Sequence, residues 1–452
     1  MKIAVVGAGY VGLVTAVCLA DRGHEVVVAE QNDERRNTIA SGKAPFFEPL
    51  LDELLIETMK SKKLSLVPDI AQAVSGAELS FIAVGTPFNG ESIDLSQVSK
   101  AASEIGKALK GSPHYHVVAV KSTVVPGTTD TLVREAVERQ SRLTLGEFGL
   151  CMNPEFLREG SAIEDFRNPD RIVIGSADER SASVLHNLYS GFGCPILHTN
   201  LRNAELTKYC SNSLLALLVS FSNELATLCE KFPDIDIDVV MDGAHLDRRL
   251  SPVIDGKLIR PQILSYLRAG CGFGGSCLPK DVMALRRFAQ SQGVDTPVLD
   301  AVMTVNNERA EQLMQMLEMV LGDLRTREVA VLGLSFKPNT DDVRESPALR
   351  LISTLLSKGC RVRSYDPMVS ASSLPQEFSR VVPAESAYAA SENADALIIA
   401  TAWEEFASLD WERLTANMHK AIILDGRRLL AKKQLPPRVV YLPIGSNHSK
   451  VR

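Results

Sequence analysis

The sequence lacks the features that mark nucleic-acid-binding, membrane and secreted proteins. It has no long basic run, and a formal net charge of -6 argues against a dedicated nucleic-acid surface. Its most apolar internal segment, residues 214–221, is too short to span a bilayer. The chain enters a strand directly at residues 3–6, without the apolar region of an export signal. We therefore expect a cytoplasmic protein that has neither nucleic acid nor membrane as a partner.

Disulfide and zinc frameworks are also missing. The eight cysteines are scattered without framework spacing, which fits a reducing compartment. Cys271 and Cys277 lie close together but lack a second pair at zinc spacing, so we expect no metal site. What remains is a composition of 45% hydrophobic and 23% charged residues, which is ordinary for a soluble globular protein.

The pattern of strands and helices predicts the architecture. A chain of 452 residues is long enough for two or three domains with full cores. Buried strands alternate with helical segments towards both ends, and the middle is helical. The expected fold is α/β, with two Rossmann-like doubly wound parallel-sheet domains joined by a central helical domain. The predicted domains are residues 1–199, 200–322 and 323–452. The predicted strands are 3–6, 25–29, 79–84 and 117–120 in the first half, and 329–333, 361–365, 396–400 and 421–424 in the last domain.

A glycine-rich turn, residues 7–12, follows the first strand and opens a helix. In this setting, with the acid Glu30 at the end of the next strand, the pattern is a strong signal for a bound dinucleotide. Its first glycine permits the tight turn, its second lets a pyrophosphate approach the backbone, and its third allows close helix packing. Glu30 would bind the adenosine ribose and repel a 2′-phosphate, which favours NAD. Arg35 and Arg36 leave NADP open, because a nearby arginine can bind the 2′-phosphate.

Hydroxyl residues follow two further strands, where parallel sheets bind ligands at the carboxyl ends. Thr86, Ser122 and Thr123 are therefore candidates for contacting nicotinamide and its ribose. Each of the three could equally be a helix N-cap.

The middle of the chain contains a charged loop and a long apolar helix. The loop, residues 151–161, has two glutamates and an arginine among residues unlike a buried element, and is either a site or a solvated loop. The helix, predicted over 200–231, carries Lys208 and Asn212 one turn apart on one face. A buried lysine must be paired or deprotonated, whereas a surface lysine would need no partner. A helix this apolar is normally buried at an interface, so we expect it to form both a domain connector and a dimer contact.

The stretch from Cys271 to Asp281 concentrates flexible glycines, a thiol, a cation and a carboxylate. Its glycines let the backbone approach a ligand, and Pro279 suits the first turn of a helix. Cys277 would then lie at or just before a helix N-terminus, where the partial positive charge favours thiolate. The alternative, an inert buried cysteine, does not explain the dense polar context. We therefore predict that Cys277 is a nucleophile.

The last domain repeats the α/β pattern without the dinucleotide fingerprint. Lys337 and Arg344 follow its first strand. A cation pair at a strand end suits a diphosphate, although solvated surface charge is the alternative.

Six motifs give the whole chain a family resemblance. They are Val-Val-Gly-Ala-Gly-Tyr-Val-Gly, Val-Gly-Thr-Pro, Lys-Ser-Thr-Val, Asn-Pro-Glu-Phe-Leu-Arg-Glu-Gly, Gly-Gly-Ser-Cys-Leu-Pro-Lys-Asp and Phe-Lys-Pro-Asn-Thr-Asp-Asp-Val-Arg-Glu-Ser-Pro. In content and in order they resemble the nucleotide-sugar 6-dehydrogenases, the UDP-glucose and GDP-mannose dehydrogenase family. The resemblance implies an NAD-dependent, four-electron oxidation of a sugar C6 hydroxyl to a carboxylate. UDP-glucose is the expected substrate, with GDP-mannose or another UDP-hexose as the alternative.

The resemblance also implies roles by position. Cys277 matches the nucleophile, Asp281 a water-orienting carboxylate, Lys208 and Asn212 the groups around the oxyanion, and Glu155 an acid/base. The implied cofactor-binding residues are Gly7, Gly9, Tyr10, Val11, Gly12, Glu30, Arg35, Thr86, Ser122, Thr123, Glu159, Lys280 and Arg344. The implied substrate-binding residues are Phe156, Leu157, Arg158, Arg249, Arg260, Arg268, Phe273, Gly274, Phe336, Lys337 and Arg427.

Residue chemistry supports the four-electron reaction. An aldehyde is a poor hydride donor until a nucleophile adds to its carbonyl, and the Cys277 thiolate would supply that nucleophile. Two rival functions remain. A two-electron alcohol or hydroxyacid dehydrogenase would leave the thiol loop unexplained. A non-catalytic dinucleotide-binding protein would be expected to lack one of the residues that are present here.

One segment departs from the UDP-glucose branch. Residues 247–270 are longer than in those enzymes, and their Tyr-Leu-Arg-Ala-Gly end resembles the GDP-mannose branch. The segment around Arg158 and the later Leu-Asp-Gly-Arg427 resemble the UDP-glucose branch. In the family an arginine of the 247–270 segment can reach a partner subunit's substrate, and Arg268 is the best placed of the three candidates relative to the glycines.

Overall fold

The structure is a computed structural model that describes residues 1–369 and 374–447. Residues 370–373 and 448–452, which the third predicted domain includes, lie outside the described residues. The chain forms two compact units. The first comprises Met1–Ser211 with Met283–Gln292, and the second comprises Asn212–Val282 with Gly293–Arg452.

The first unit is built on a mostly parallel sheet in the order β3-β2-β1-β4-β5-β6-β7-β8. Only the β6–β7 pair is antiparallel. The strand order reverses between β1 and β4, which is where doubly wound folds bind ligands at the carboxyl ends of their strands. The strands are β1 Lys2–Val6, β2 Glu25–Ala29, β3 Leu64–Val67, β4 Leu79–Ile82, β5 Val117–Val120, β6 Gly149–Met152, β7 Ile172–Ser176 and β8 Ile196–Thr199.

Helices cover both faces of this sheet, because alternate residues of its strands feed two separate apolar layers. One layer contains α1 Tyr10–Asp21, α2 Asp33–Ala40, α3 Leu51–Lys60, α7 Ala162–Arg167 and α8 Glu179–Tyr189. The other contains α4 Ile70–Val74, α5 Ser96–Leu109, η1 Thr129–Val133 and α6 Arg134–Ser141. A short helix, η2 Ser190–Phe192, follows α8.

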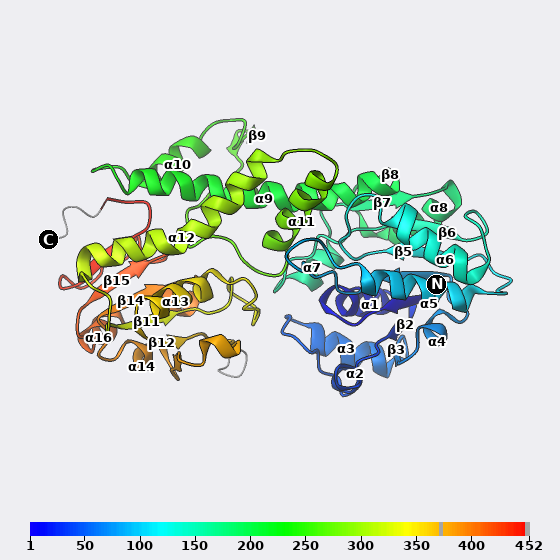
Figure 1. Ribbon diagram of the computed structural model, residues 1–452, viewed down its shortest axis with the longest axis horizontal. Helices are drawn as coiled ribbons and strands as arrows, with labels where there is room; N and C mark the ends of the chain where they lie inside the picture. The colour runs from blue at the N-terminus through cyan, green and yellow to red at the C-terminus, as the bar shows by residue number, and fades with distance from the viewer. Residues whose placement is uncertain (370–373, 448–452) are drawn as a thin grey trace. The chain divides into compact units, whose positions relative to one another are not determined.

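The second unit contains an entirely parallel sheet in the order β13-β12-β11-β14-β15-β16. Figure 1 shows α12 and α13 on one side of this sheet and α14 and α16 on the other, and two apolar clusters fill these layers. The strands are β11 Glu328–Leu332, β12 Arg361–Tyr365, β13 Val382–Pro383, β14 Ala396–Ile399, β15 Ile422–Asp425 and β16 Val440–Pro443. The helices are α12 Pro297–Leu321, α13 Pro347–Ser357, η5 Gln376–Phe378, α14 Ala387–Ser391, α15 Glu404–Ala407 and α16 Trp411–Ala416.

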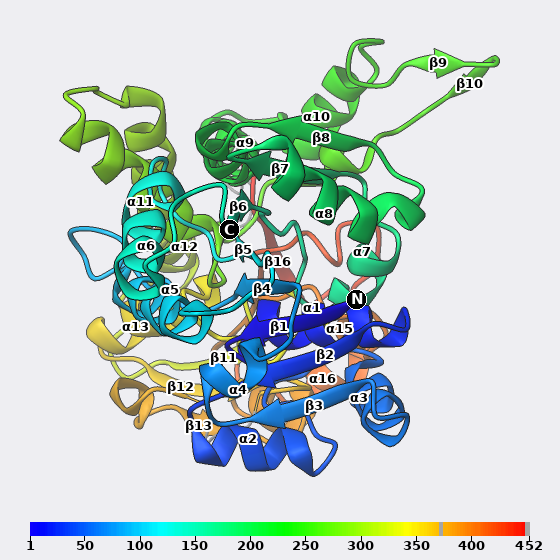
Figure 2. The same ribbon diagram turned by 90° about the vertical axis from the view of Figure 1, so that its right-hand side faces the viewer.

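The remaining helices belong to the middle of the chain. They are α9 Leu201–Cys229, α10 Ile237–His245, η3 Gln262–Tyr266 and α11 Leu278–Ser291. Of the three boundaries between the two units, one falls inside α9 and one inside α11, and the third follows α11 at Gln292. A small hairpin, β9 Val253–Ile254 and β10 Lys257–Leu258, projects beyond α10 (Figure 2).

Of the described helices, one passes the length and composition test for a membrane span. It covers Leu201–Lys231, so it is longer than the apolar run 214–221 considered from sequence. About half of its most apolar window, 44%, is buried inside the structure. Core helices of soluble proteins pass the same test, so the match has little weight.

The predicted fold class is confirmed: the chain forms two Rossmann-like sheets, and the part of the sequence between them is helical. Each predicted strand corresponds to a real one, but several were missed, including β3, β6, β7 and β8. Helix α12 begins at Pro297, because proline is accommodated in the first turn of a helix. The prediction that 151–161 contains no buried element was wrong, since the segment starts in β6 and stays buried through Glu155.

Candidate active site

The turn between β1 and α1 has the geometry of a dinucleotide-binding loop. Gly7 has φ 99°, and a Cβ there would meet Ala83 O at 2.8 Å. A Cβ on Gly12 would lie 2.0 Å from Gly7 O, so only glycine lets the helix pack this close. A Cβ on Gly9, in contrast, would meet nothing within 4 Å. The backbone at Gly9 is therefore open to a ligand, as a pyrophosphate requires.

Glu30, just after β2, is buried and oriented by backbone donors. Its carboxylate accepts hydrogen bonds from Ala8 N at 3.0 Å and Asn32 N at 2.9 Å. Arg35 Nη1 lies 3.3 Å from the same carboxylate. A carboxylate has about four lone-pair sites, so it retains capacity for a ribose hydroxyl. Because Arg35 is already paired with Glu30, the local charge does not favour a 2′-phosphate, and the residues present fit NAD.

Hydroxyl side chains in the loops after β4 and β5 form hydrogen bonds between these two loops. Thr86 Oγ1 donates to Thr123 O at 2.9 Å, and Ser122 Oγ donates to Val84 O at 2.7 Å. None of the three is a helix N-cap, because α5 is capped at Leu95 and η1 at Thr128. The capping alternative is therefore wrong, and each hydroxyl oxygen keeps acceptor capacity.

The first unit holds a buried ion pair at the end of β6. Lys208 Nζ lies 2.8 Å from Glu155 Oε1, and both side chains are almost fully buried. Glu155 Oε2 accepts a hydrogen bond from Leu157 N at 2.6 Å. Phe156 lies beside the pair, with Lys208 Nζ 5.5 Å from its ring centroid. The alternatives of a solvated loop and a surface lysine are thus excluded for Glu155 and Lys208.

A second buried cation, Lys121, interacts electrostatically with Glu155. Burial lowers the pKa of Lys121 to about 8, while the nearby Glu155 charge opposes that shift. Burial also acts to raise the pKa of Glu155, but Lys208, the Leu157 N–H and Lys121 outweigh it, so the pKa of Glu155 lies below its usual value. Glu155 is therefore a carboxylate at neutral pH, which suits it to accept a proton rather than to donate one.

Sequence reasoning missed Glu48, which organises the far end of the 151–161 loop. Its carboxylate accepts from Gly160 N and Ala162 N, both at 2.7 Å, and from the Tyr10 hydroxyl. Burial and the Glu48 charge raise the pKa of Tyr10, which keeps its hydroxyl protonated as a donor. Glu48 lies in a loop without a motif, so no local pattern could have identified it.

The second unit places Cys277 directly before α11. The Cys277 carbonyl accepts from Asp281 N at 2.9 Å, so the cysteine occupies the position that begins the helix, as predicted. Asp281 is 1% exposed, and its two oxygens take different partners. Asn212 Nδ2 donates to Oδ2 at 2.6 Å, and Lys280 Nζ donates to Oδ1 at 2.6 Å. A thiol at a helix N-terminus and an oriented carboxylate one turn later thus share one helix end.

Loops at the carboxyl ends of β11 and β15 enclose the cysteine segment. A Cβ on Gly274 would lie 2.2 Å from Glu345 O, and one on Gly275 would lie 2.8 Å from the Phe336 ring. Gly275 N donates to Arg344 O at 3.0 Å. On the β15 side, a Cβ on Gly270 would lie 2.9 Å from Arg427 Nη1. The glycines of this segment therefore allow other parts of the protein, and not only a ligand, to pack closely against its backbone.

The other predicted cations of the second unit take intramolecular partners. Arg344 pairs with Asp342 through two contacts of 2.8 Å, and Lys337 Nζ lies 5.5 Å from the Phe336 ring centroid. Arg427 Nε donates to Ala400 O at 2.6 Å. The backbones of these residues lie at the strand ends, where a nucleotide is expected.

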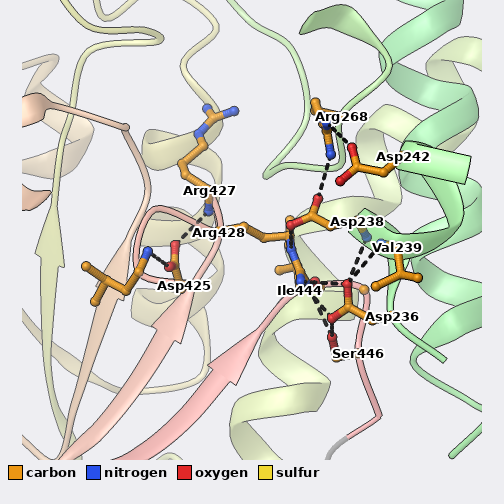
Figure 3. Close-up of polar contacts among 12 residues, drawn as sticks. Asp236, Asp238, Val239, Asp242, Arg268, Asp425, Arg427, Arg428, Ile444 and Ser446 are labelled. Atoms are coloured by element: carbon orange, nitrogen blue, oxygen red, sulfur yellow. Dashed lines mark hydrogen bonds and ion pairs between the residues drawn. The ribbon is translucent and has the colours of Figure 1, made fainter. Parts of the chain in front are cut away.

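The three arginine candidates of the 247–270 segment lie in different settings. Arg249 is exposed and pairs with Asp247, and Arg260 is exposed beyond the β9–β10 hairpin. Arg268 pairs with Asp238 at 3.2 Å and Asp242 at 2.6 Å on α10 (Figure 3). Figure 3 also shows Arg428 bonded to Asp238 and Asp236, which fastens the segment around Ser446 to α10.

The remaining predicted residues are distributed over the first unit. Arg158 pairs with Asp165, and Val11 lies in the first turn of α1. Glu159 lies between Arg158 and Gly160, whose N–H is bound by Glu48. In residues 1–369 and 374–447 no group of three or more histidine, cysteine or acidic side chains could hold a metal ion.

Comparisons with known proteins give a consistent result. Models of the UDP-glucose/GDP-mannose dehydrogenase family match at residues 1–193 (NAD binding domain), 202–308 (central domain) and 330–432 (UDP binding domain). The UDP-glucose 6-dehydrogenases of Rhizobium meliloti and Pseudomonas aeruginosa are 40% and 39% identical, each over 96% of this chain and over 97% and 95% of their own length. The structure of a UDP-glucose dehydrogenase from the hyperthermophilic archaeon Pyrobaculum islandicum matches with a TM-score of 0.89 at 39% identity, covering 98% of this chain and 97% of that one.

Proposed function

The chain belongs to the UDP-glucose/GDP-mannose dehydrogenase family, and from that membership we propose that it oxidises the C6 hydroxyl of UDP-glucose to the carboxylate of UDP-glucuronate. Its cofactor is NAD. The observation that carries the choice of substrate is the full-length match to UDP-glucose 6-dehydrogenases. The motif order and the Cys277 helix end support a four-electron reaction.

NAD, when bound, supplies the hydride acceptor for each of the two oxidations. The residues proposed to hold it are those of the glycine turn, residues 7–12, together with Glu30, Arg35, Thr86, Ser122, Thr123, Glu159, Lys280 and Arg344. Support comes from the open backbone at Gly9 and from the buried Glu30 carboxylate.

We assign proton handling in the first oxidation to Glu155. The substrate hydroxyl must lose a proton as its carbon loses hydride, and an ionised buried carboxylate can take that proton directly or through an ordered water. Lys208, paired with Glu155, supplies the positive charge that stabilises the developing oxyanion.

We assign the second oxidation to Cys277. Its thiolate adds to the aldehyde carbon, and the carbonyl oxygen becomes the oxyanion of a thiohemiacetal stabilised by Lys208 and Asn212. Loss of hydride from that carbon leaves a thioester on Cys277. Water then attacks the thioester, and Asp281 orients the water and takes its proton while the thiolate leaves. The Asn212 and Lys280 hydrogen bonds support this role because they orient the Asp281 carboxylate.

The nucleotide sugar is proposed to lie against the strand-end loops of the second unit. The residues proposed to bind it are Phe156, Leu157, Arg158, Arg249, Arg260, Arg268, Phe273, Gly274, Phe336, Lys337 and Arg427. The family's UDP binding domain, matched at residues 330–432, supports the part of this set that lies there. The same matches support the proposed domain limits of 1–199, 200–322 and 323–452.

We further propose that the protein is a cytoplasmic homodimer, or a higher homo-oligomer, that supplies a uronic acid for polysaccharide biosynthesis. Contact through α9 is supported by an apolar stripe at heptad spacing: Leu214, Phe221 and Leu228 are 47%, 49% and 55% exposed. Apolar side chains at this spacing suit packing against a second helix, and sedimentation analysis of Phe221→Glu would test the contact.

The test of the function is the amount of NADH formed per sugar nucleotide. UDP-glucose, GDP-mannose and other UDP-hexoses are supplied in limiting amount with excess NAD. Two NADH per UDP-glucose, with slower turnover of the others, are expected. One NADH would instead identify a two-electron dehydrogenase, and preferred turnover of GDP-mannose would reassign the substrate.

A further inference from the structure

The backbone before Cys277 is held by an asparagine that has no part in the chemistry above. Asn306 lies on α12 and is 2% exposed. Its side-chain amide makes two hydrogen bonds to a single residue of the cysteine segment: Oδ1 accepts from Phe273 N at 2.8 Å, and Nδ2 donates to Phe273 O at 3.1 Å. Phe273 is itself buried, so Asn306 satisfies both polar groups of a buried residue's backbone.

The backbone at Gly272 packs directly against the Asn306 side chain. Gly272 has φ 104°, and a Cβ there would lie 2.6 Å from Asn306 Oδ1. An L-residue with a side chain is disfavoured in this conformation and would collide with the amide. The segment therefore cannot shift towards α12, and the double hydrogen bond opposes a shift away from it.

Two more side chains hold Gly270, the residue directly before the cysteine segment. Asn223 Oδ1 on α9 accepts from Gly270 N at 2.7 Å, and Arg309 Nε on α12 donates to Gly270 O at 3.1 Å. Arg309 is fully buried and pairs with Glu230 at 3.1 Å. The start of the segment is thus anchored to two helices.

The downstream side of the segment is held by the loop after β11. Gly275 N donates to Arg344 O at 3.0 Å, and Gly274 lies directly against Glu345 O. Between the Phe273 clamp and the helix start at Cys277 only three residues remain. The position of the Cys277 sulfur therefore depends on the hydrogen bonds that hold residues 270, 273 and 275. Of these three residues, only Phe273 is held by a single side chain, that of Asn306.

We propose that Asn306 is a positioning residue that sets the location of the Cys277 sulfur for the second oxidation, an inference that rests on the proposed function. The first oxidation does not use the sulfur, so Asn306 acts on one of the two half-reactions. A displacement of about 1 Å at a reacting atom can cost about 100-fold in rate.

The test uses the sugar nucleotide at the aldehyde level of oxidation, which separates the half-reactions. With NAD it reports the second oxidation, and with NADH it reports the reverse of the first. Asn306→Asp keeps the side-chain volume and the acceptor for Phe273 N but removes the donor to Phe273 O. Asn306→Ser removes both bonds. The control is Asn307→Asp, at the adjacent exposed position, where the side chain accepts from Arg350 at 3.2 Å.

For both Asn306 variants the expected result is a fall of about 100-fold in aldehyde oxidation with a change of less than about 3-fold in aldehyde reduction. The control should leave both rates unchanged. Equal loss of both half-reactions, or loss of neither, would overturn the inference. If Asn306→Ser does not fold, the aspartate variant decides the question alone. A wild-type enzyme that reduces the aldehyde but cannot oxidise it would instead contradict the proposed function.

Discussion

Glu205 offers a quantitative test of the buried electrostatics near the strand ends of the first unit. It lies on α9 and is fully buried, and its carboxylate accepts from Gly127 N at 2.6 Å and Thr129 N at 2.8 Å. Burial raises the pKa of Glu205 to about 7, with Asp130 acting in the same direction and the Thr129 and Gly127 donors opposing it. Asp130 is itself paired with Arg202 at 2.8 Å.

The raised pKa fixes the direction in which stability depends on pH. Between about pH 4.5 and pH 7 the unfolded chain loses the Glu205 proton while the folded chain keeps it. The contribution of this group to stability is therefore complete below about pH 4.5 and is lost as pH rises through about 7. A shift of this size corresponds to about 3 kcal/mol in the free energy of unfolding.

The assay compares wild type with Glu205→Gln by urea unfolding at pH 5, 6, 7 and 8. The substitution loses one backbone partner, at a cost of about 1–3 kcal/mol that does not depend on pH. The difference in unfolding free energy between the two proteins should therefore shift by about 3 kcal/mol in favour of the variant from pH 5 to pH 8. Glu224→Gln, at an exposed position on the same helix, should give no shift. A pH-independent difference for Glu205→Gln would refute the reasoning.

Two further outcomes follow from charged groups with defined partners. Glu30→Ala should raise the KM for NAD about 10-fold or more, because it removes the acceptor for the ribose hydroxyls. It should also reduce the preference for NAD over NADP, because Arg35 loses its partner. Unchanged KM values for both cofactors would count against the assignment of Glu30. Arg428→Met should lower the free energy of unfolding by about 3–5 kcal/mol, because Asp236 and Asp238 lose a largely buried partner. If chemical denaturation shows a loss below about 1 kcal/mol, solvent replaces the ion pairs of the two aspartates.

The sequence was sufficient for features whose cause is local. The turn at residues 7–12 needs glycine for steric reasons, and Pro279 with the helical pattern after it located the start of α11 at Cys277. These depend on residues adjacent in the chain. The fold class followed from alternating strands and helices for the same reason.

Features that depend on distant partners could not be predicted in this way. The burial of Glu155 was missed because its partners, Lys208 and Lys121, lie far away in the sequence and make a buried charge tolerable. Glu48 and Asn306 act through backbone groups of distant loops, which leave no pattern around them. Strands β6 and β7, which pair antiparallel, were missed because such short strands carry no distinct periodicity.

The central claim is that one sulfur atom links the two oxidations. The most direct test is the rate of carboxylate formation from UDP-glucose by Cys277→Ser, measured with excess NAD and analysis of the sugar product. The account predicts that the variant removes the first hydride and stops before the carboxylate. Formation of UDP-glucuronate at the wild-type rate would contradict it.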